Sequence, residues 1–317
     1  MRHILLLACL LLPFTAAQAQ KRSFAAGRFA FGVDGQFAGF VKKVSGGAIE
    51  GEIADHKLGT STQERKQLST VSHEPLTMEV GLGGGGPLWD WIQASFDKGF
   101  VVDRAELFSY DFDNGVKAVR RYEDAFINKI SIPPLDVDNP EPGYWTVELD
   151  AEILRYGTEP LKDEDVAGDE NVGSKKWLCS NFRLELGDLP CDRVSKIDGF
   201  TWEQGVVYDS FAEERNAKEK ASLKVPNLHL SISMADLAPW QEWFDRALKE
   251  GDDETATQGS LAFLGPDMKE ELATIGFEHI GIISLEQEAV EANAEQVARF
   301  TVELYVEEMF LDTYNGK

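Results

Sequence analysis

The sequence repeats one pattern of residues at an interval of about 153 positions. The first block of the pattern comprises Phe29, Phe31, Val33, Val41, Val44 and Gly46, and it returns as Phe182, Leu184, Leu186, Val194, Ile197 and Gly199. The second comprises Leu88, Trp91, Ile92, Phe96 and Gly99, and it returns as Trp240, Trp243, Phe244, Leu248 and Gly251. The third runs from Trp145 to Leu149 and returns from Phe300 to Leu304. Because chance explains one such block but not three, the sequence predicts two copies of one fold, and a duplicated subunit favours an assembly that fills two places of a ring with each chain.

The first 19 residues are typical of a cleavable export signal. Arg2 and His3 precede an apolar run from Leu5 to Leu12, and the small residues Ala17 and Ala19 suit cleavage before Gln20. The apolar run is too short to remain as a membrane anchor. We therefore expect residues 1–19 to direct export to the periplasm or the cell exterior, and the mature chain to carry no membrane span.

Composition limits the partners of the chain. It carries 55 Asp and Glu residues against 31 Lys and Arg, a net charge of −24. Such a surface repels nucleic-acid phosphates and anionic lipids, so we expect neither as a partner. Hydrophobic residues make up 43% of the sequence, which is enough for packed cores.

The expected organisation is two domains joined by an acidic linker. Residues 158–176 are rich in Asp, Glu and Gly and poor in large apolar side chains, so they cannot bury enough surface to fold. This places one domain at 20–157 and the other at 177–317. The Pro-rich segment 131–144 has no Pro-rich counterpart in the second half and is expected to form a loop.

Each half has the pattern of several strands and one short helix. Alternating apolar residues predict strands at Phe29–Val33 and Leu76–Val80, and Asp34-Gly35 predicts a hairpin turn. Apolar residues at helical spacing follow Pro87 and Pro239, and proline is tolerated in the first turn of a helix. A further hairpin is expected around Asp113-Asn-Gly115, and the last strand of each half alternates apolar residues with carboxylates.

Cys179 and Cys191 are the cysteines outside the export signal. In a tight hairpin around Gly187, Leu186 would face Leu189 and Cys191 would face Leu184. Cys179 would then lie about 16 Å further along the strand, beyond the reach of a disulfide. We expect two free thiols, with a bond between neighbouring chains as the alternative.

One glycine-rich motif invites a cofactor interpretation. Gly81–Gly86 follows a strand, precedes a helix and is followed by Asp103, the outline of a dinucleotide site. The preceding strand alternates with Thr77 and Glu79, whereas a central parallel strand is apolar on both faces. We expect a flexible strand-to-helix loop and no cofactor, and keep a dinucleotide-binding enzyme as a lesser alternative.

Other reactive residue types form no convincing site. Asp111, Asp113 and Glu123 resemble a calcium loop, but Gly115 falls one position early, so a hairpin turn is expected. His56, His73, His229 and His279 are scattered without metal-ligand spacing. No nucleophile elbow or acid–base pair is present, so the prediction is no catalytic, cofactor-binding or metal residues.

With these patterns assembled, each half resembles the tail tube proteins of contractile phages and type VI secretion systems. The resemblance rests on Phe29–Gly46, on Leu88-Trp-Asp-Trp91-Ile92, on the Asn114-Gly115 turn and on Phe126-Ile-Asn128, and ends with the strand Trp145–Ile153. The second half matches it at Phe182–Gly199, Trp240–Leu248 and Phe300–Met309, and departs where Gly265-Pro266 replaces the Asn-Gly turn.

The resemblance implies a mainly β fold, with two tandem β-barrels that each carry a short flanking helix. It further implies copies joined edge to edge into six-membered rings, which three chains of this kind would close as a pseudo-hexamer, and Glu148 and Glu303 lining an acidic lumen. The expected function is therefore an exported structural protein that partners itself in rings or tubes and is not an enzyme. The alternative is a monomeric secreted binding module that uses the loop 131–144.

Overall fold

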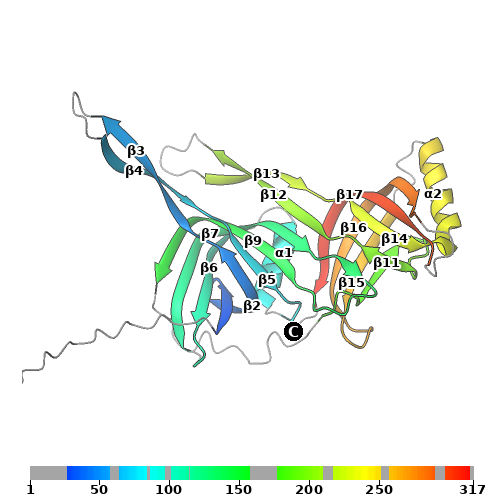
Figure 1. Ribbon diagram of the computed structural model, residues 1–317, viewed down its shortest axis with the longest axis horizontal. Helices are drawn as coiled ribbons and strands as arrows, with labels where there is room; N and C mark the ends of the chain where they lie inside the picture. Colours follow the sequence, from blue (N-terminus) through cyan, green and yellow to red (C-terminus); the bar gives the residue numbers. More distant parts are fainter. Residues whose placement is uncertain are drawn as a thin grey trace, which may run out of the picture.

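A computed structural model describes residues 27–57, 64–83, 86–96, 101–113, 115–157, 177–209, 217–250, 257–289 and 297–314. The predicted export signal and the acidic linker lie outside these residues. The fold is mainly β, as expected, and two short helices accompany the strands (Figure 1).

The first half of the chain forms a closed barrel. Its sheet follows the order β7-β6-β1-β2-β5-β9, and a further pairing of β7 with β9 closes the circle. All of these pairings are antiparallel. The six strands are β1 (Arg28–Val33), β2 (Gln36–Gly46), β5 (Leu76–Val80), β6 (Val101–Tyr110), β7 (Val116–Ile132) and β9 (Trp145–Gly157). The helix α1 (Gly86–Phe96) follows β5.

The second half follows the same order of strands but stays open as a half-barrel. Its sheet runs β10-β15-β16-β17-β14-β11, and β10 and β11 do not pair. These strands are β10 (Phe182–Leu186), β11 (Val194–Ile197), β14 (Leu228–Ser233), β15 (Thr257–Leu264), β16 (Glu271–Gln287) and β17 (Arg299–Tyr314). A short 3-10 turn η1 (Met234–Asp236) leads into the helix α2 (Leu237–Glu250).

The opening begins directly after the turn that follows β10. The predicted turn forms, with Gly187 at φ 50°, and Leu186 faces Leu189 in an isolated bridge. Beyond this bridge β10 pairs with β15, whereas β11 pairs with β14 and β8. The carbonyl of Pro190 accepts a hydrogen bond from the Trp240 indole at 3.2 Å. In the described residues Cys191 does not pair with Leu184, contrary to the sequence prediction.

The Pro-rich segment 131–144 fills the opening. Its strand β8 (Leu135–Asp136) pairs with β11, and Pro142 forms a bridge with Leu178 just before β10. The amide of Gly143 donates to the carbonyl of Trp177 at 2.9 Å. The segment is thus built into the second half through backbone pairing with β11 and with the residues before β10.

The main apolar core runs through both halves, and a smaller cluster around Phe108 lies apart from it in the first half. A row of aromatic rings crosses it, from Trp89 of α1 to Trp145 of β9, then to Phe263 of β15 and Trp177, with ring centroids 5.0 to 5.2 Å apart. All four side chains are buried. Packing of this kind fixes the two halves against each other.

Several local predictions are confirmed. Asp34 and Gly35 adopt positive φ angles of 47° and 78° in the β1–β2 turn, where both central residues of a tight hairpin require them. Both helices begin near the expected prolines. Buried apolar and more exposed side chains alternate along β9 and β17, as expected. Cys179 and Cys191 are both free thiols.

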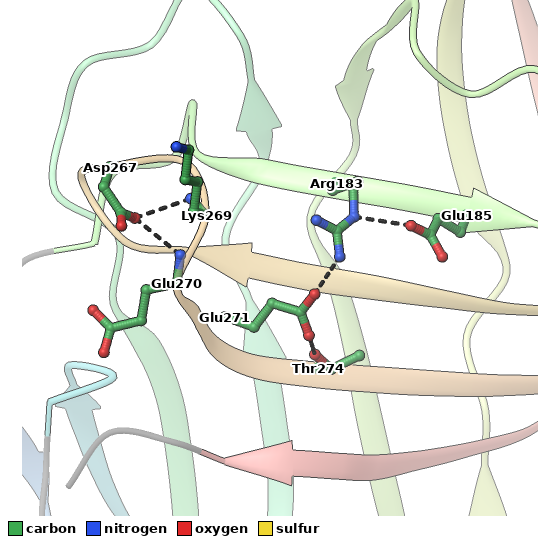
Figure 2. A network of polar contacts seen from close by, with 7 residues as sticks. All are labelled: Arg183, Glu185, Asp267, Lys269, Glu270, Glu271 and Thr274. Carbon is green, nitrogen blue, oxygen red and sulfur yellow. Dashed lines mark hydrogen bonds and ion pairs between the residues drawn. The ribbon is translucent and has the colours of Figure 1, made fainter.

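A polar network lies on the outer side of the half-barrel, around the edge strand β10 (Figure 2). Arg183 forms ion pairs with Glu185 on its own strand and with Glu271 at the start of β16. The strand β15 lies between β10 and β16, and its residue Ala262 lies opposite Arg183. Because the Ala262 side chain is small, the guanidinium can extend across β15 to Glu271. In the adjoining turn, Asp267 accepts hydrogen bonds from the amides of Lys269 and Glu270, both at 2.9 Å.

Within the described part of the chain, neither helix is long and apolar enough to cross a membrane.

Candidate functional site

The two halves are joined by an added strand. The strand β12 (Phe200–Asp209) belongs to the second half but pairs with the end of β7 in the first. Phe200 lies opposite Ile132, and Trp202 lies opposite Ile130. The buried Trp202 ring also packs against Phe96 of α1, with centroids 4.7 Å apart. Backbone pairing and apolar packing therefore both contribute to this joint between the halves.

A row of alternating charges crosses the same joint. Lys129 of β7 lies 3.9 Å from Glu148 in its own half and 3.7 Å from Glu203 in the other. Glu203 is in turn 3.8 Å from Lys224 on β13 (Ala217–Lys224). Because each carboxylate stands beside an ammonium group, the row brings no like charges together.

The helix α1 covers the other side of the joint. The Trp89 ring stacks on Tyr314 of β17 at 4.5 Å, and the Gln93 amide donates to the carbonyl of Leu311 at 3.2 Å. Burial raises the pKa of Tyr314, whose hydroxyl donates to the carbonyl of Leu82. The helix is thus enclosed between the two sheets, beside β17 in Figure 1.

The first half carries a hairpin that matches β12–β13 but, in the described part of the chain, pairs with neither sheet. It consists of β3 (Ile49–Lys57) and β4 (Glu64–His73), which form a separate two-stranded sheet. Glu50 lies opposite Ser72, as Glu203 lies opposite Lys224 in the other hairpin. Figure 1 shows β3–β4 projecting from the end of the molecule opposite to α2.

One face of this free hairpin is apolar and exposed. Ile49, Ile53, Leu68 and Val71 share it, with 41 to 62% of each side chain accessible. Ile49, Gly51 and Ile53 alternate in the sequence, and this spacing was the available signal for a strand that the sequence analysis did not identify. An apolar face of this kind on an isolated hairpin indicates a contact surface.

The second half has matching surfaces that are likewise uncovered. At Ser284–Gln287, β16 pairs with β17 on one side, and within the described residues no strand lies on the other. Leu285 remains partly exposed there, whereas Ile130, at the matching position of β7, is fully buried. On α2, Leu248 is 68% exposed, whereas its sequence counterpart Phe96 is 5% exposed.

The glycine-rich motif follows a strand that is paired differently from the strand of a dinucleotide fold. The strand β5 that precedes it pairs antiparallel with β2 and β9 inside the barrel. A dinucleotide fold needs a parallel strand at this place, with helices on both faces of the sheet. The described strands around Gly81–Gly86 therefore do not have the arrangement on which the dinucleotide interpretation depends. Gly84 and Gly85 lie outside the described residues.

The calcium-like sequence forms the expected hairpin turn between β6 and β7. The Asp111 carboxylate accepts hydrogen bonds from the amides of Asp113 and Gly115, at 3.0 and 2.8 Å. Its ion pair with Lys117, at 2.9 Å, and these backbone bonds lower the pKa of Asp111. In the described part of the chain, no group of three His, Cys, Asp or Glu side chains is placed to hold a metal ion.

Glu148 and Glu303 occupy matching places on the polar faces of their sheets. Glu148 accepts a hydrogen bond from Asn128 at 3.0 Å, and Glu303 accepts one from Asn227 at 2.8 Å. Each also lies 3.9 Å from a basic side chain, Lys129 and His229 respectively.

The other histidines named in the sequence analysis lie elsewhere. His73 lies opposite Ile49 on β4, and His279 has a positive φ on β16. The His56 side chain lies outside the described residues.

Neither protein-family models nor curated proteins match this sequence. Solved structures resemble parts of it at low identity. A PVC sheath–tube complex from an extracellular contractile injection system is 15% identical, covers 44% of this chain and 94% of its own, and has a TM-score of 0.38. The baseplate of the anti-feeding prophage is 16% identical, covers 41% of this chain and 89% of its own, and has a TM-score of 0.30. The cap that terminates the tube of that prophage is 18% identical, covers 47% of this chain and 100% of its own, and has a TM-score of 0.39.

Proposed function

We propose that this chain is an exported structural protein that assembles with copies of itself, head to tail, into rings or tubes. In this proposal residues 1–19 are a signal peptide, and 20–157 and 177–317 are tandem copies of a tail-tube-like domain joined by the linker 158–176. The protein acts by assembly and not by catalysis.

The observation that carries the proposal is the joint between the two halves. One joint of this kind exists inside the chain, where β12 extends the sheet at β7 and α1 lies against β17. Among the residues that the structure describes, nothing pairs with the corresponding surfaces at the two ends of the molecule, the β3–β4 hairpin and the β16 edge beside α2. An exposed sheet edge and an exposed apolar hairpin are aggregation hazards unless a partner covers them.

The symmetry of a contact between copies determines which kind of assembly forms. The hairpin and the β16 edge are different surfaces, so a contact between them is head-to-tail. Head-to-tail contacts generate closed rings when the rotation closes and open helical filaments when it does not. The resemblance to tail tube proteins implies rings with six places. Three chains would supply the six halves for such a ring, so a trimeric ring is the expected closed form. Glu148 and Glu303 would then face the lumen from matching positions.

Light scattering coupled to size exclusion tests this proposal on residues 20–317, together with negative-stain microscopy of the same peak. We expect trimers, or rings with apparent sixfold symmetry. A monomer at every accessible concentration would overturn the assembly proposal and favour a monomeric binding module. Lys substitutions at both Glu148 and Glu303 that leave ion passage through an assembled tube unchanged would reject the lumen assignment alone.

A further inference from the structure

We propose that β3 of one copy adds as a strand to the β16 edge of the next copy, with Ile49 opposite Leu285 and Glu50 opposite Ser284. This inference rests on the proposed self-assembly and specifies the surface, the partner and the register.

The β16 side of the register follows from the strand pairings of the two halves. Lys129 lies opposite Glu148, and Ile130 lies opposite Val147. In the second half, Ser284 lies opposite Glu303, and Leu285 lies opposite Val302. The same irregularity in the ladder precedes both sets, between Ile127 and Lys129 and between Ile282 and Ser284. Ser284 and Leu285 therefore stand where Lys129 and Ile130 stand in the internal joint.

The β3 side follows in the same way. Glu203 and Gln204 lie opposite Lys224 and Leu223 in the hairpin that forms the internal joint. Glu50 and Gly51 lie opposite Ser72 and Val71 in the free hairpin. Ile49 therefore corresponds to Trp202, and Glu50 corresponds to Glu203.

The side chains at these positions suit the contact. In the internal joint, Trp202 is buried against Phe96 of α1, with Ile130 opposite it in the neighbouring strand. In the joint between copies, Ile49 would meet Leu285 and Leu248 of the next copy. These three apolar side chains are exposed or partly exposed in the single chain. Burying them supplies a hydrophobic contribution to association.

The occupant is a second copy because the hairpin cannot reach its own β16. Figure 1 places β3–β4 at one end of the molecule and β16 with α2 toward the other. The hairpin β12–β13 already extends from the second half onto the first, in the same sense as β3–β4 extends outward from the first. Repeating the internal joint between chains thus brings the free hairpin of one copy to the free edge of the next.

One difference between the joints offers a gain-of-function test. Lys129 lies between Glu148 and Glu203 in the internal joint. Ser284 would lie between Glu303 of its own chain and Glu50 of the neighbour, so the two carboxylates would lack an ammonium group between them. Ser284→Lys restores the internal pattern, and we expect it to lower the midpoint concentration of assembly several-fold at low salt.

The register is tested by disulfide trapping between two singly substituted chains. One carries Glu50→Cys and the other Ser284→Cys, and the two are mixed, oxidised mildly and separated on a non-reducing gel. We expect a mixed disulfide between the two chains and none within either preparation alone. Glu52→Cys with Ser284→Cys is the matched control, because it shifts the pairing by about 7 Å along the strand and should trap far less.

The outcomes separate this inference from the proposed function. Assembled protein that forms no Glu50→Cys/Ser284→Cys bond would overturn the inference and leave self-assembly standing. Efficient bonding of Glu50→Cys to itself would also overturn it, since that result means a two-fold contact between hairpins. A monomer by light scattering would remove both proposals.

A surface variant adds an independent measurement. Ile49→Asp places a carboxylate on the exposed hairpin face, and we expect it to raise the midpoint concentration of assembly at least tenfold. Phe112→Asp is the matched control, because Phe112 is 78% exposed in the β6–β7 turn and lies on neither surface. Equal effects of the two variants would count against the hairpin.

Discussion

Gly143 lies directly against the indole ring of Trp177, so close that a Cβ on Gly143 would come within 1.7 Å of a ring carbon. The two residues are also joined by a backbone hydrogen bond of 2.9 Å. The contact holds the Pro-rich segment of the first half in the opening between β10 and β11, with Trp177 buried beneath it. The second half is therefore completed by a segment that precedes it in the chain.

We expect Gly143→Ala to destabilise the protein by about 1–3 kcal/mol or more, because the buried indole has no room to withdraw. The free energy of unfolding from a urea titration checks this. Gly81→Ala is the control, since its nearest neighbour, a Tyr144 ring carbon, would lie 3.9 Å from the new Cβ. Equal stability of the two variants would show that the 131–144 segment is not held as described.

Truncating Trp202 tests the internal joint. The side chain is fully buried and packs on Phe96 across the joint. We expect Trp202→Ala to cost about 3–5 kcal/mol, the usual range for removing a buried aromatic ring. Urea unfolding followed by both circular dichroism and fluorescence would measure it, with Phe112→Ala as an exposed control that stays within about 0.5 kcal/mol. A loss no greater than that of the control would mean that the joint is not a stabilising contact.

The ion pair of Asp136 with Lys196 predicts a pH dependence of stability. A hydrogen bond from the Asp138 amide and the Lys196 ammonium, each at 2.9 Å, hold the pKa of Asp136 below its usual value. A carboxyl whose folded pKa is depressed stabilises the fold above its unfolded pKa of about 3.9. That contribution is lost as the pH falls through the folded pKa.

Asp136→Asn is therefore expected to be less stable than the parent at pH 6, with the difference shrinking below about pH 4. Urea titrations at a series of pH values measure both proteins. A difference that stays constant down to the lowest accessible pH would contradict the role of the charge.

The two thiols are expected to react slowly in the native protein. Burial raises the pKa of Cys191 to about 12 and that of Cys179 above its usual value. Since the thiolate is the reactive form, iodoacetamide at pH 8 should modify the unfolded chain much faster than the native one. Mass spectrometry of timed samples checks this. Rapid modification of native Cys191 would contradict the described burial and reopen the alternative of a bond between chains.

Local features of this fold could be predicted from the sequence because they depend on neighbouring residues. Asp34-Gly35 supplies the two positive φ angles of a tight hairpin, and the apolar spacing from Leu88 to Phe96 defines a buried helix face. The hairpin β3–β4 was missed, since its alternation at Ile49 and Ile53 does not face a core and lies in a mostly polar stretch.

The sequence by itself determined which side of each strand is apolar, where the hairpins turn and where the helices begin. Only the tertiary structure decided which strands are neighbours: that β8 lies beside β11, that β12 lies beside β7, and that β3 and β16 keep an edge unpaired by any described strand. The physical reason is that side-chain alternation specifies the face of a strand that is buried. The edges of a strand pair through backbone N–H and C=O groups that are almost identical in every residue.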